Sequence, residues 1–527
     1  GLERQKMTEG KELIKYFCVP CKPTKSNGNR TRNRPCHDIN KWETFKKYCM
    51  RDVDVERQIA DKLKMYPISD EEHRLYVLDQ IINDRGGLVD SELAEQAVKL
   101  NSIQTAVAVE QAYMITGLEN PNSVTQLKQW LKEKGVEIES LSKKSVKSLA
   151  DETDGDVSEM LKLRLLMAKT SVKKYEAVIR SVCSDNRVHG MMRFCGANRT
   201  GRWSGNILQP QNLPQNHLPD LTLARDIVKD GDFEMLDMMF GNVPNVLSEL
   251  IRTVLIPKPN HRFIVADFSA IEARVLAWIA GEQWRIDTFK NGGDIYCASA
   301  SKMFKVPVEK HGVNGELRQK GKISELACGY GGSVGALKNM GAVEMGVQEN
   351  ELQGLINDWR NANPHIVRFW YEVGNAAMKA IKEKTTVPLG KLVFAYERGI
   401  LFIRLPSGRR LSYIKPRIGT NRFGGDSITY MGINSAKKWD RLETFGGKLT
   451  ENIVQGTARD LLANALINAA NAGYDTVFHV HDEIICEVPN GYGSVDELCK
   501  LMCIKPEWAD GLPLNADGFE CEYYKKE

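Results

Sequence analysis

Two acidic residues stand side by side between largely apolar runs near the end of the chain. Asp482 and Glu483 follow His481, with residues 477–480 before them and residues 484–488 after them. Runs that contain β-branched residues on both sides of a short polar segment predict two strands joined as a hairpin. Both carboxylates would then lie at the tip of this hairpin. Because a buried carboxylate beside another is costly, we expect a cation close to this pair.

A second apolar run ends on a carboxylate far upstream. Residues 263–266, Phe-Ile-Val-Ala, lead into Asp267, and residues 267–272 open a predicted helix. A carboxylate at the end of a buried strand, matched by another on a hairpin, predicts a site for two divalent metal ions. Two such ions a few ångströms apart would serve phosphoryl transfer.

Three motifs occur in the order typical of the A family of DNA polymerases, which includes bacterial DNA polymerase I and many phage replicases. They are residues 267–274, 318–331 and 481–483. The chain resembles that family well over residues 190–527 and more loosely over 67–190. The resemblance implies an α+β right-hand polymerase with an antiparallel-sheet palm, helical fingers and a helical thumb. It also implies template-directed addition of dNTPs to a primer 3′-hydroxyl, in phage or bacterial DNA replication.

The resemblance divides the chain into regions. They would be the C-terminal remnant of a 3′–5′ exonuclease domain at 1–66, the thumb at 67–190, the palm at 191–282, the fingers at 283–390, and the rest of the palm at 391–527, with an insertion near 416–448. Tyr48 and Asp52 resemble the last exonuclease motif, but nothing upstream supplies its partner carboxylates. We expect both residues to be vestigial and the chain to show no proofreading. The rest of that domain would have been removed or would be a separate chain.

The family's two metal-binding aspartates match Asp267 and Asp482. The resemblance adds the backbone carbonyl of Phe268 as a ligand and Glu483 as an accessory carboxylate. The expected cofactor is a pair of Mg²⁺ ions, for which Mn²⁺ could substitute.

The expected nucleotide site lies on a helix. Arg318 and Lys322 are four residues apart, so both project from one helix face. The resemblance implies that they hold the triphosphate, that Lys322 protonates the leaving pyrophosphate, and that Tyr330 stacks near the template base. At two further nucleotide positions the chain departs from the family: Leu326 replaces a usual aromatic residue and Tyr296 a usual histidine. Because Leu326 replaces the aromatic residue, the family's discrimination against 3′-modified nucleotides cannot be assumed for this chain.

Other matching positions concern the sugar and the DNA. Glu272 matches the steric gate that excludes a ribose 2′-hydroxyl, although a glutamate near a helix N-terminus can also serve the helix dipole alone. The resemblance implies DNA contacts from Arg202, Gln455, His481 and Arg274. A minor-groove donor tests base-pair geometry without reading sequence. The alternatives are a surface arginine at 202, a buried structural amide at 455 and a turn-shaping residue at 481.

The composition and hydropathy of the chain bear on which other classes of protein it could belong to. With 42% hydrophobic and 27% charged residues, the chain is typical of globular proteins. Its net charge of +4 does not by itself indicate nucleic-acid binding. No apolar run is long enough to span a membrane and no signal-peptide core is present. We expect a monomer in the cytoplasm, that of a bacterial host if a phage encodes the chain.

The twelve cysteines are scattered along the chain. Cys18, Cys21 and the pair Cys36 and His37 raise the possibility of zinc, but adjacent side chains tend to point apart. We therefore favour free thiols in a reducing compartment.

Two other functions remain open. A single-subunit RNA polymerase would share the palm and both aspartates, but Glu272 and the exonuclease remnant argue against it. A catalytically silent DNA-binding or scaffold subunit would not need its catalytic residues intact. The expected partners are primer-template DNA and dNTPs, with a separate exonuclease chain or a replisome accessory protein as a further candidate. The segment 416–448 could contact DNA or such a partner.

Overall fold

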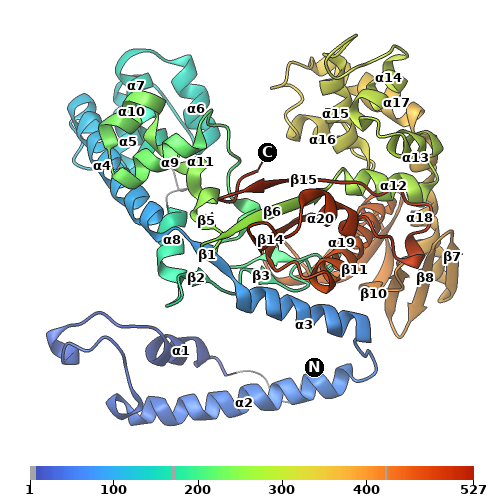
Figure 1. Ribbon diagram of the computed structural model, residues 1–527, viewed down its shortest axis with the longest axis horizontal. Helices are drawn as coiled ribbons and strands as arrows, with labels where there is room; N and C mark the ends of the chain where they lie inside the picture. The colour runs from blue at the N-terminus through green and yellow to red at the C-terminus, as the bar shows by residue number, and fades with distance from the viewer. Residues whose placement is uncertain (1–6, 168–172, 422–423, 527) are drawn as a thin grey trace. The chain divides into compact units, whose positions relative to one another are not determined.

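The structure, a computed structural model, describes residues 7–167, 173–421 and 424–526. It contains two compact units, Gly1–Tyr76 and Val77–Glu527, both drawn in Figure 1. The division falls inside helix α3 (Asp70–Arg85), and therefore after the boundary expected at residue 66.

The first unit is helical. Helices α1 (Gly10–Cys18) and α2 (Ile39–Leu63) meet through an aromatic stack. The Phe17 and Phe45 ring centroids lie 5.4 Å apart, and those of Phe45 and Tyr48 lie 6.1 Å apart. The stacked rings of Phe17 and Phe45 therefore join the two helices.

All twelve cysteines are unpaired thiols. The Cys21 thiol donates to the Arg30 carbonyl at 3.4 Å. Within the described ranges, no set of three or more His, Cys, Asp or Glu side chains is arranged to hold a metal ion. None of the described helices has the length and apolar character needed to cross a bilayer.

The second unit is built on a four-stranded antiparallel sheet in the order β13, β14, β6, β15, at the centre of that unit in Figure 1. Its strands are β6 (His261–Phe268), β13 (Thr476–Val480), β14 (Glu483–Pro489) and β15 (Ala516–Cys521). Ile264 and Ala266 face one hydrophobic core, and Phe263 and Val265 face another. Because both faces are buried, the strand is apolar at successive positions rather than alternating. The predicted strand and hairpin are confirmed.

Helices cover both faces of this sheet. The core on the Ile264 side is shared with α12 (Ile271–Ala280), α19 (Gly446–Asn471) and α20 (Val495–Met502). The core on the Phe263 side is shared with α4 (Ser91–Thr116), α8 (Lys173–Ser181), α9 (Leu221–Asp230), α10 (Phe233–Phe240) and α11 (Val243–Leu250). The helix predicted after Asp267 is therefore present.

The far end of α4 packs into a separate helical cluster. That cluster contains α5 (Val124–Glu133), α6 (Lys143–Glu152) and α7 (Gly155–Met167). The Ser123 side chain accepts from the Gln126 amide and caps α5, as predicted. Two small sheets connect this region to the centre, in the order β2 (Arg187–Val188), β1 (Gly87–Val89), β5 (Leu255–Ile256), and β3 (Met192–Arg193) with β4 (Ser204–Gly205).

A second helical region follows α12, at the right of Figure 1. Its helices are α13 (Gln283–Lys290), α14 (Ile295–Phe304), α15 (Leu317–Cys328), α16 (Val334–Asn339), α17 (Leu352–Ala362) and α18 (Pro364–Glu383). A buried ion pair joins Arg285 of α13 to Glu325 of α15, with Nη1 and Oε1 2.8 Å apart. Glu325 also accepts from Ser299 of α14 and Trp359 of α17, at 2.8 Å each. These contacts tie α15 to three neighbouring helices.

A six-stranded antiparallel sheet lies in sequence between α18 and α19. Its order is β12 (Trp439–Thr444), β11 (Asp426–Ile433), β10 (Arg410–Thr420), β9 (Ile400–Arg404), β8 (Leu392–Glu397), β7 (Thr386–Leu389). It shares a hydrophobic core with α18 and α19. Strands β9 and β10 pair as an antiparallel hairpin. The segment expected as an insertion forms the end of β10 and all of β11 and β12.

Candidate active site

The central sheet brings two predicted carboxylates together. Asp267 lies near the end of β6, and Asp482 lies in the turn before β14, where the Phe268 amide donates to its carbonyl at 3.3 Å. His481 makes the turn with a φ of 55° in the left-handed region. Glu483 then lies directly opposite Asp267 across the sheet. Residues more than two hundred positions apart in sequence therefore meet at one edge.

The carboxylates at this edge resist ionisation. Burial, followed by the charges of Glu272 and Asp267, raises the pKa of Asp482 to about 7. Burial also raises the pKa of Asp267, and the positive charge of Lys526 opposes that rise. Carboxylates crowded in a poorly solvated place are stabilised by a cation between them. The arrangement therefore fits a divalent metal ion held by Asp267 and Asp482.

Glu483, beside this pair, has a partner of its own. Its carboxylate accepts from the Tyr524 hydroxyl at 2.8 Å, and Arg252 donates to the same hydroxyl at 3.0 Å. Burial raises the pKa of Glu483 to about 7. One of its carboxylate oxygens is therefore held by Tyr524, and the role of Glu483 as an accessory metal ligand remains a prediction. Two aspartates with a backbone carbonyl still suit Mg²⁺, which takes its other ligands from phosphate and water.

Tyr524 and Arg252 are functional candidates that sequence reasoning missed. Both are buried, and Tyr524 lies in the short segment after β15. No local pattern marks either residue.

A second group forms around the predicted steric gate. Glu272 lies in the first turn of α12 and accepts from Arg202 at 3.1 Å and from the Tyr330 hydroxyl at 2.8 Å. Burial and the charge of Glu272 raise the pKa of Tyr330 well above its ordinary value. Tyr330 therefore remains a protonated donor. Three predicted site residues from three segments therefore meet here. Arg202 and Tyr330 fix the orientation of the Glu272 carboxylate.

The helix α15 presents the predicted triphosphate ligands. Arg318 donates through Nη2 to Asp294 at 2.8 Å, and its guanidinium lies 5.2 Å from the centre of the Tyr296 ring. The hydrogen bond to Asp294 is the main cause that raises the pKa of Arg318. Lys322 follows one turn later, and Leu326 is 51% exposed. Asp294, which also caps α14, was not predicted as a site residue.

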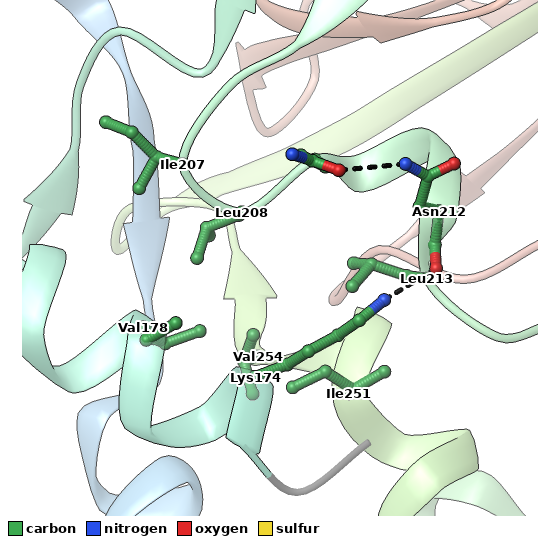
Figure 2. A pocket seen from close by; sticks show the side chains of 10 residues that line it. Lys174, Val178, Ile207, Leu208, Asn212, Leu213, Ile251 and Val254 are labelled. Carbon is green, nitrogen blue, oxygen red and sulfur yellow. Dashed lines mark hydrogen bonds between the residues drawn. The ribbon is translucent and has the colours of Figure 1, made fainter. Parts of the chain in front are cut away.

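Two basic side chains hold the backbone of residues 212–214. Arg252 donates to the Leu213 and Pro214 carbonyls at 2.7 Å each. Lys174 donates to the Asn212 carbonyl at 2.6 Å, and Figure 2 shows it reaching across a small cavity to do so. The cavity has a volume of about 180 Å³. Arg252 therefore connects this segment to Tyr524 and, through it, to the carboxylate edge.

Two predicted DNA contacts have different surroundings. The side chain of Gln455 on α19 donates to Glu451 at 3.3 Å, one helical turn away. It is partly exposed, so it can exchange this bond for another acceptor. Arg274 is buried, and it donates to the Ser269 and Pro513 carbonyls at 2.6 and 3.1 Å. From its position on α12 the guanidinium reaches these carbonyls, and a DNA contact for Arg274 remains a prediction.

The predicted exonuclease residues lie in the first unit. A hydrogen bond with Asp52 raises the pKa of Tyr48. Neither residue belongs to a described group of carboxylates that could hold a metal ion. Their vestigial role remains a prediction.

Comparisons with known proteins identify the family of this chain. The family model of DNA polymerase family A matches residues 91–503. A DNA polymerase of Bacillus phage SP02 is 53% identical over 529 residues, covering 100% of this chain and 82% of that protein. The thermostable DNA polymerase I of Thermus aquaticus is 27% identical over 265 residues, 49% of this chain and 27% of its own length.

A solved structure supports the architecture. The POL domain of Pol1 from M. smegmatis, in complex with DNA primer-template and dNTP, matches with a TM-score of 0.61 at 19% identity. The match covers 98% of this chain and 79% of that one. The expected α+β right-hand fold, with an antiparallel-sheet palm and helical fingers and thumb, is confirmed. By the family match and the identity to the phage enzyme, the chain belongs to DNA polymerase family A.

Proposed function

We propose that this chain extends DNA primers by two-metal-ion phosphoryl transfer at Asp267 and Asp482. Membership of the family makes it a DNA-directed DNA polymerase, a nucleotidyltransferase of DNA replication. Family members generally use divalent metal ions, and we propose two Mg²⁺ ions here, replaceable by Mn²⁺. The observation that carries the proposal is the buried pair of carboxylates at the end of β6 and the tip of the hairpin.

In the reaction, the primer 3′-oxygen bonds to the α-phosphorus of the nucleotide while the bond from that phosphorus to the β-phosphate oxygen breaks. Bound ions would supply a lower pKa for the primer hydroxyl and would offset the charge of the leaving group. Asp267, Asp482 and the Phe268 carbonyl would hold these ions. Arg318, oriented by Asp294, would hold the triphosphate.

Lys322 would complete the reaction as general acid. It lies on the same face of α15 as Arg318, one turn further along. From there it would donate a proton to the pyrophosphate oxygen that leaves the α-phosphorus.

Sugar selection would depend on Glu272. Arg202 and Tyr330 hold its carboxylate from two sides, so a ribose 2′-hydroxyl would meet a fixed side chain. Glu272→Ala should therefore accept ribonucleotides more readily, by about tenfold or more in relative kcat/KM. Tyr330→Phe should relax selectivity less, because Arg202 remains. Unchanged selectivity in Glu272→Ala would refute the gate.

Several finer assignments belong to the same proposal. Arg202, Gln455 and His481 would contact the primer-template, and the region boundaries given in the sequence analysis would apply. The enzyme would act as a monomer in the cytoplasm of a bacterial host, without proofreading of its own. Degradation of a primer by the pure protein would refute that last point.

Primer extension tests the proposal directly. The wild type, Asp482→Ala and the control Asp496→Ala, an exposed acid on α20, would be supplied with Mg²⁺ and either dNTPs or rNTPs. Extension with dNTPs that is lost only in Asp482→Ala supports the assignment. Extension with rNTPs would indicate RNA synthesis. No extension by the wild type would favour a catalytically silent DNA-binding or scaffold subunit.

A further inference from the structure

A cavity of about 820 Å³ borders the proposed nucleotide site. One wall begins at Ser269 and Ala270, directly after Asp267. Another wall contains Asp294 and Tyr296, which lie against Arg318. The cavity therefore borders two residues that contact Arg318, the side chain proposed to hold the triphosphate.

The charge of this cavity is positive. Its lining includes four basic side chains, Arg274, Lys290, Lys310 and Lys505. The three lysines are exposed, and none of them forms an ion pair with any part of the chain that the structure describes. Three lysines around one space, without an ion-pair partner among the described residues, create a potential that attracts a compact anion.

The acidic side chains of the lining are already engaged. Asp294 is paired with Arg318. Asp517 accepts from the Ser269 hydroxyl and from the Asn515 amide. The lysine charges are therefore only partly offset within the cavity. The buried Arg274 adds a fixed charge whose hydrogen bonds go to backbone carbonyls.

We propose that this cavity receives the pyrophosphate leaving group and that Lys290, Lys310 and Lys505 form its exit path. The inference rests on the polymerase function proposed above. Pyrophosphate carries several negative charges and leaves from the end of the nucleotide away from the primer. An exposed ring of lysines binds such an anion weakly enough to release it, because water and salt screen exposed charges.

The reverse reaction isolates this site. In pyrophosphorolysis, a pyrophosphate oxygen bonds to the phosphorus of the primer-terminal nucleotide. The bond from that phosphorus to the 3′-oxygen of the preceding nucleotide breaks, that oxygen takes a proton, and a dNTP leaves. Pyrophosphate must enter through the path by which it otherwise departs, so the KM for pyrophosphate reports the cavity.

The experiment compares Lys310→Ala/Lys505→Ala with Lys500→Ala on full-length protein, primed template and Mg²⁺. Lys500 is an exposed lysine of α20 outside the cavity lining. Loss of two lysines should raise the KM for pyrophosphate about tenfold, which corresponds to about 1.4 kcal/mol. The KM for dNTP should stay within about twofold, and Lys500→Ala should match the wild type.

Three results decide the matter. A raised KM for pyrophosphate that Lys310→Arg/Lys505→Arg restores supports the exit path. An unchanged KM for pyrophosphate overturns it, as does an equal rise for dNTP, which would make the cavity part of the entry site. Failure of the wild type to extend primers would instead overturn the proposed function, so the two failures are distinguishable.

Discussion

Replacing Glu483 by glutamine should stabilise the metal-free protein above neutral pH and destabilise it at low pH. Glu483 is 2% exposed, and burial raises its pKa from 4.5 to about 7. The folded protein therefore binds a proton there more tightly than the unfolded chain does. Stability should be unaffected by this group below pH 4.5, should fall as the pH rises from 4.5 to 7, and should stay reduced above pH 7.

The size of the effect follows from that difference. An ionised Glu483 costs about 3 kcal/mol above pH 7, at 1.36 kcal/mol for each pKa unit. Glutamine removes this cost, and its amide oxygen can still accept from Tyr524. Its buried NH₂ group gains no new acceptor, which costs about 1–2 kcal/mol. The variant should therefore gain about 1–2 kcal/mol above pH 7 and lose about as much near pH 4.5.

Thermal unfolding in chelator at pH 5 and pH 8.5 measures this reversal. Glu487→Gln is the matched control, because Glu487 is buried on the same strand but paired with Arg187 at 2.8 Å. The control should be destabilised at both pH values. If Glu483→Gln lowers the midpoint equally at both, the burial argument is wrong. Since Tyr524 holds Glu483, primer extension by the variant should stay within about tenfold of the wild type.

Further predictions concern the nucleotide-binding helix and the metal pair. Glu325→Ala should lower the free energy of unfolding by about 3–5 kcal/mol, because it leaves Arg285 charged and buried without its partner. Urea unfolding monitored by tryptophan fluorescence would measure this loss, and a loss below about 1 kcal/mol would contradict the prediction. Asp294→Asn should raise the KM for dNTP severalfold with a smaller change in kcat, since Arg318 loses its ionic partner; an unchanged KM in steady-state extension would exclude that role. Asp482→Asn should abolish primer extension while raising the free energy of unfolding in chelator above pH 7. If both primer extension and the free energy of unfolding fell, the variant would be misfolded instead.

The sequence alone was enough for the local structure around the site. Continuous apolar runs ending in carboxylates predicted the strand before Asp267 and the hairpin around Asp482, because apolar strands must be buried and polar residues must end them. The four-residue spacing of Arg318 and Lys322 placed both on one helix face, since that spacing is one turn. These signals are short-range, so they are visible in the chain itself, and three motifs in order identified the family.

Only the tertiary structure decided which groups meet. Glu483 and Tyr524 are 41 residues apart, and Tyr524 and Arg252 are 272 apart, so their contacts depend on the path of the whole chain. The same holds for Asp294 beside Arg318 and for Arg274, which donates to backbone carbonyls. A motif states which side chains are available, whereas their partners depend on burial, because a buried polar group takes whatever partner the fold brings within reach.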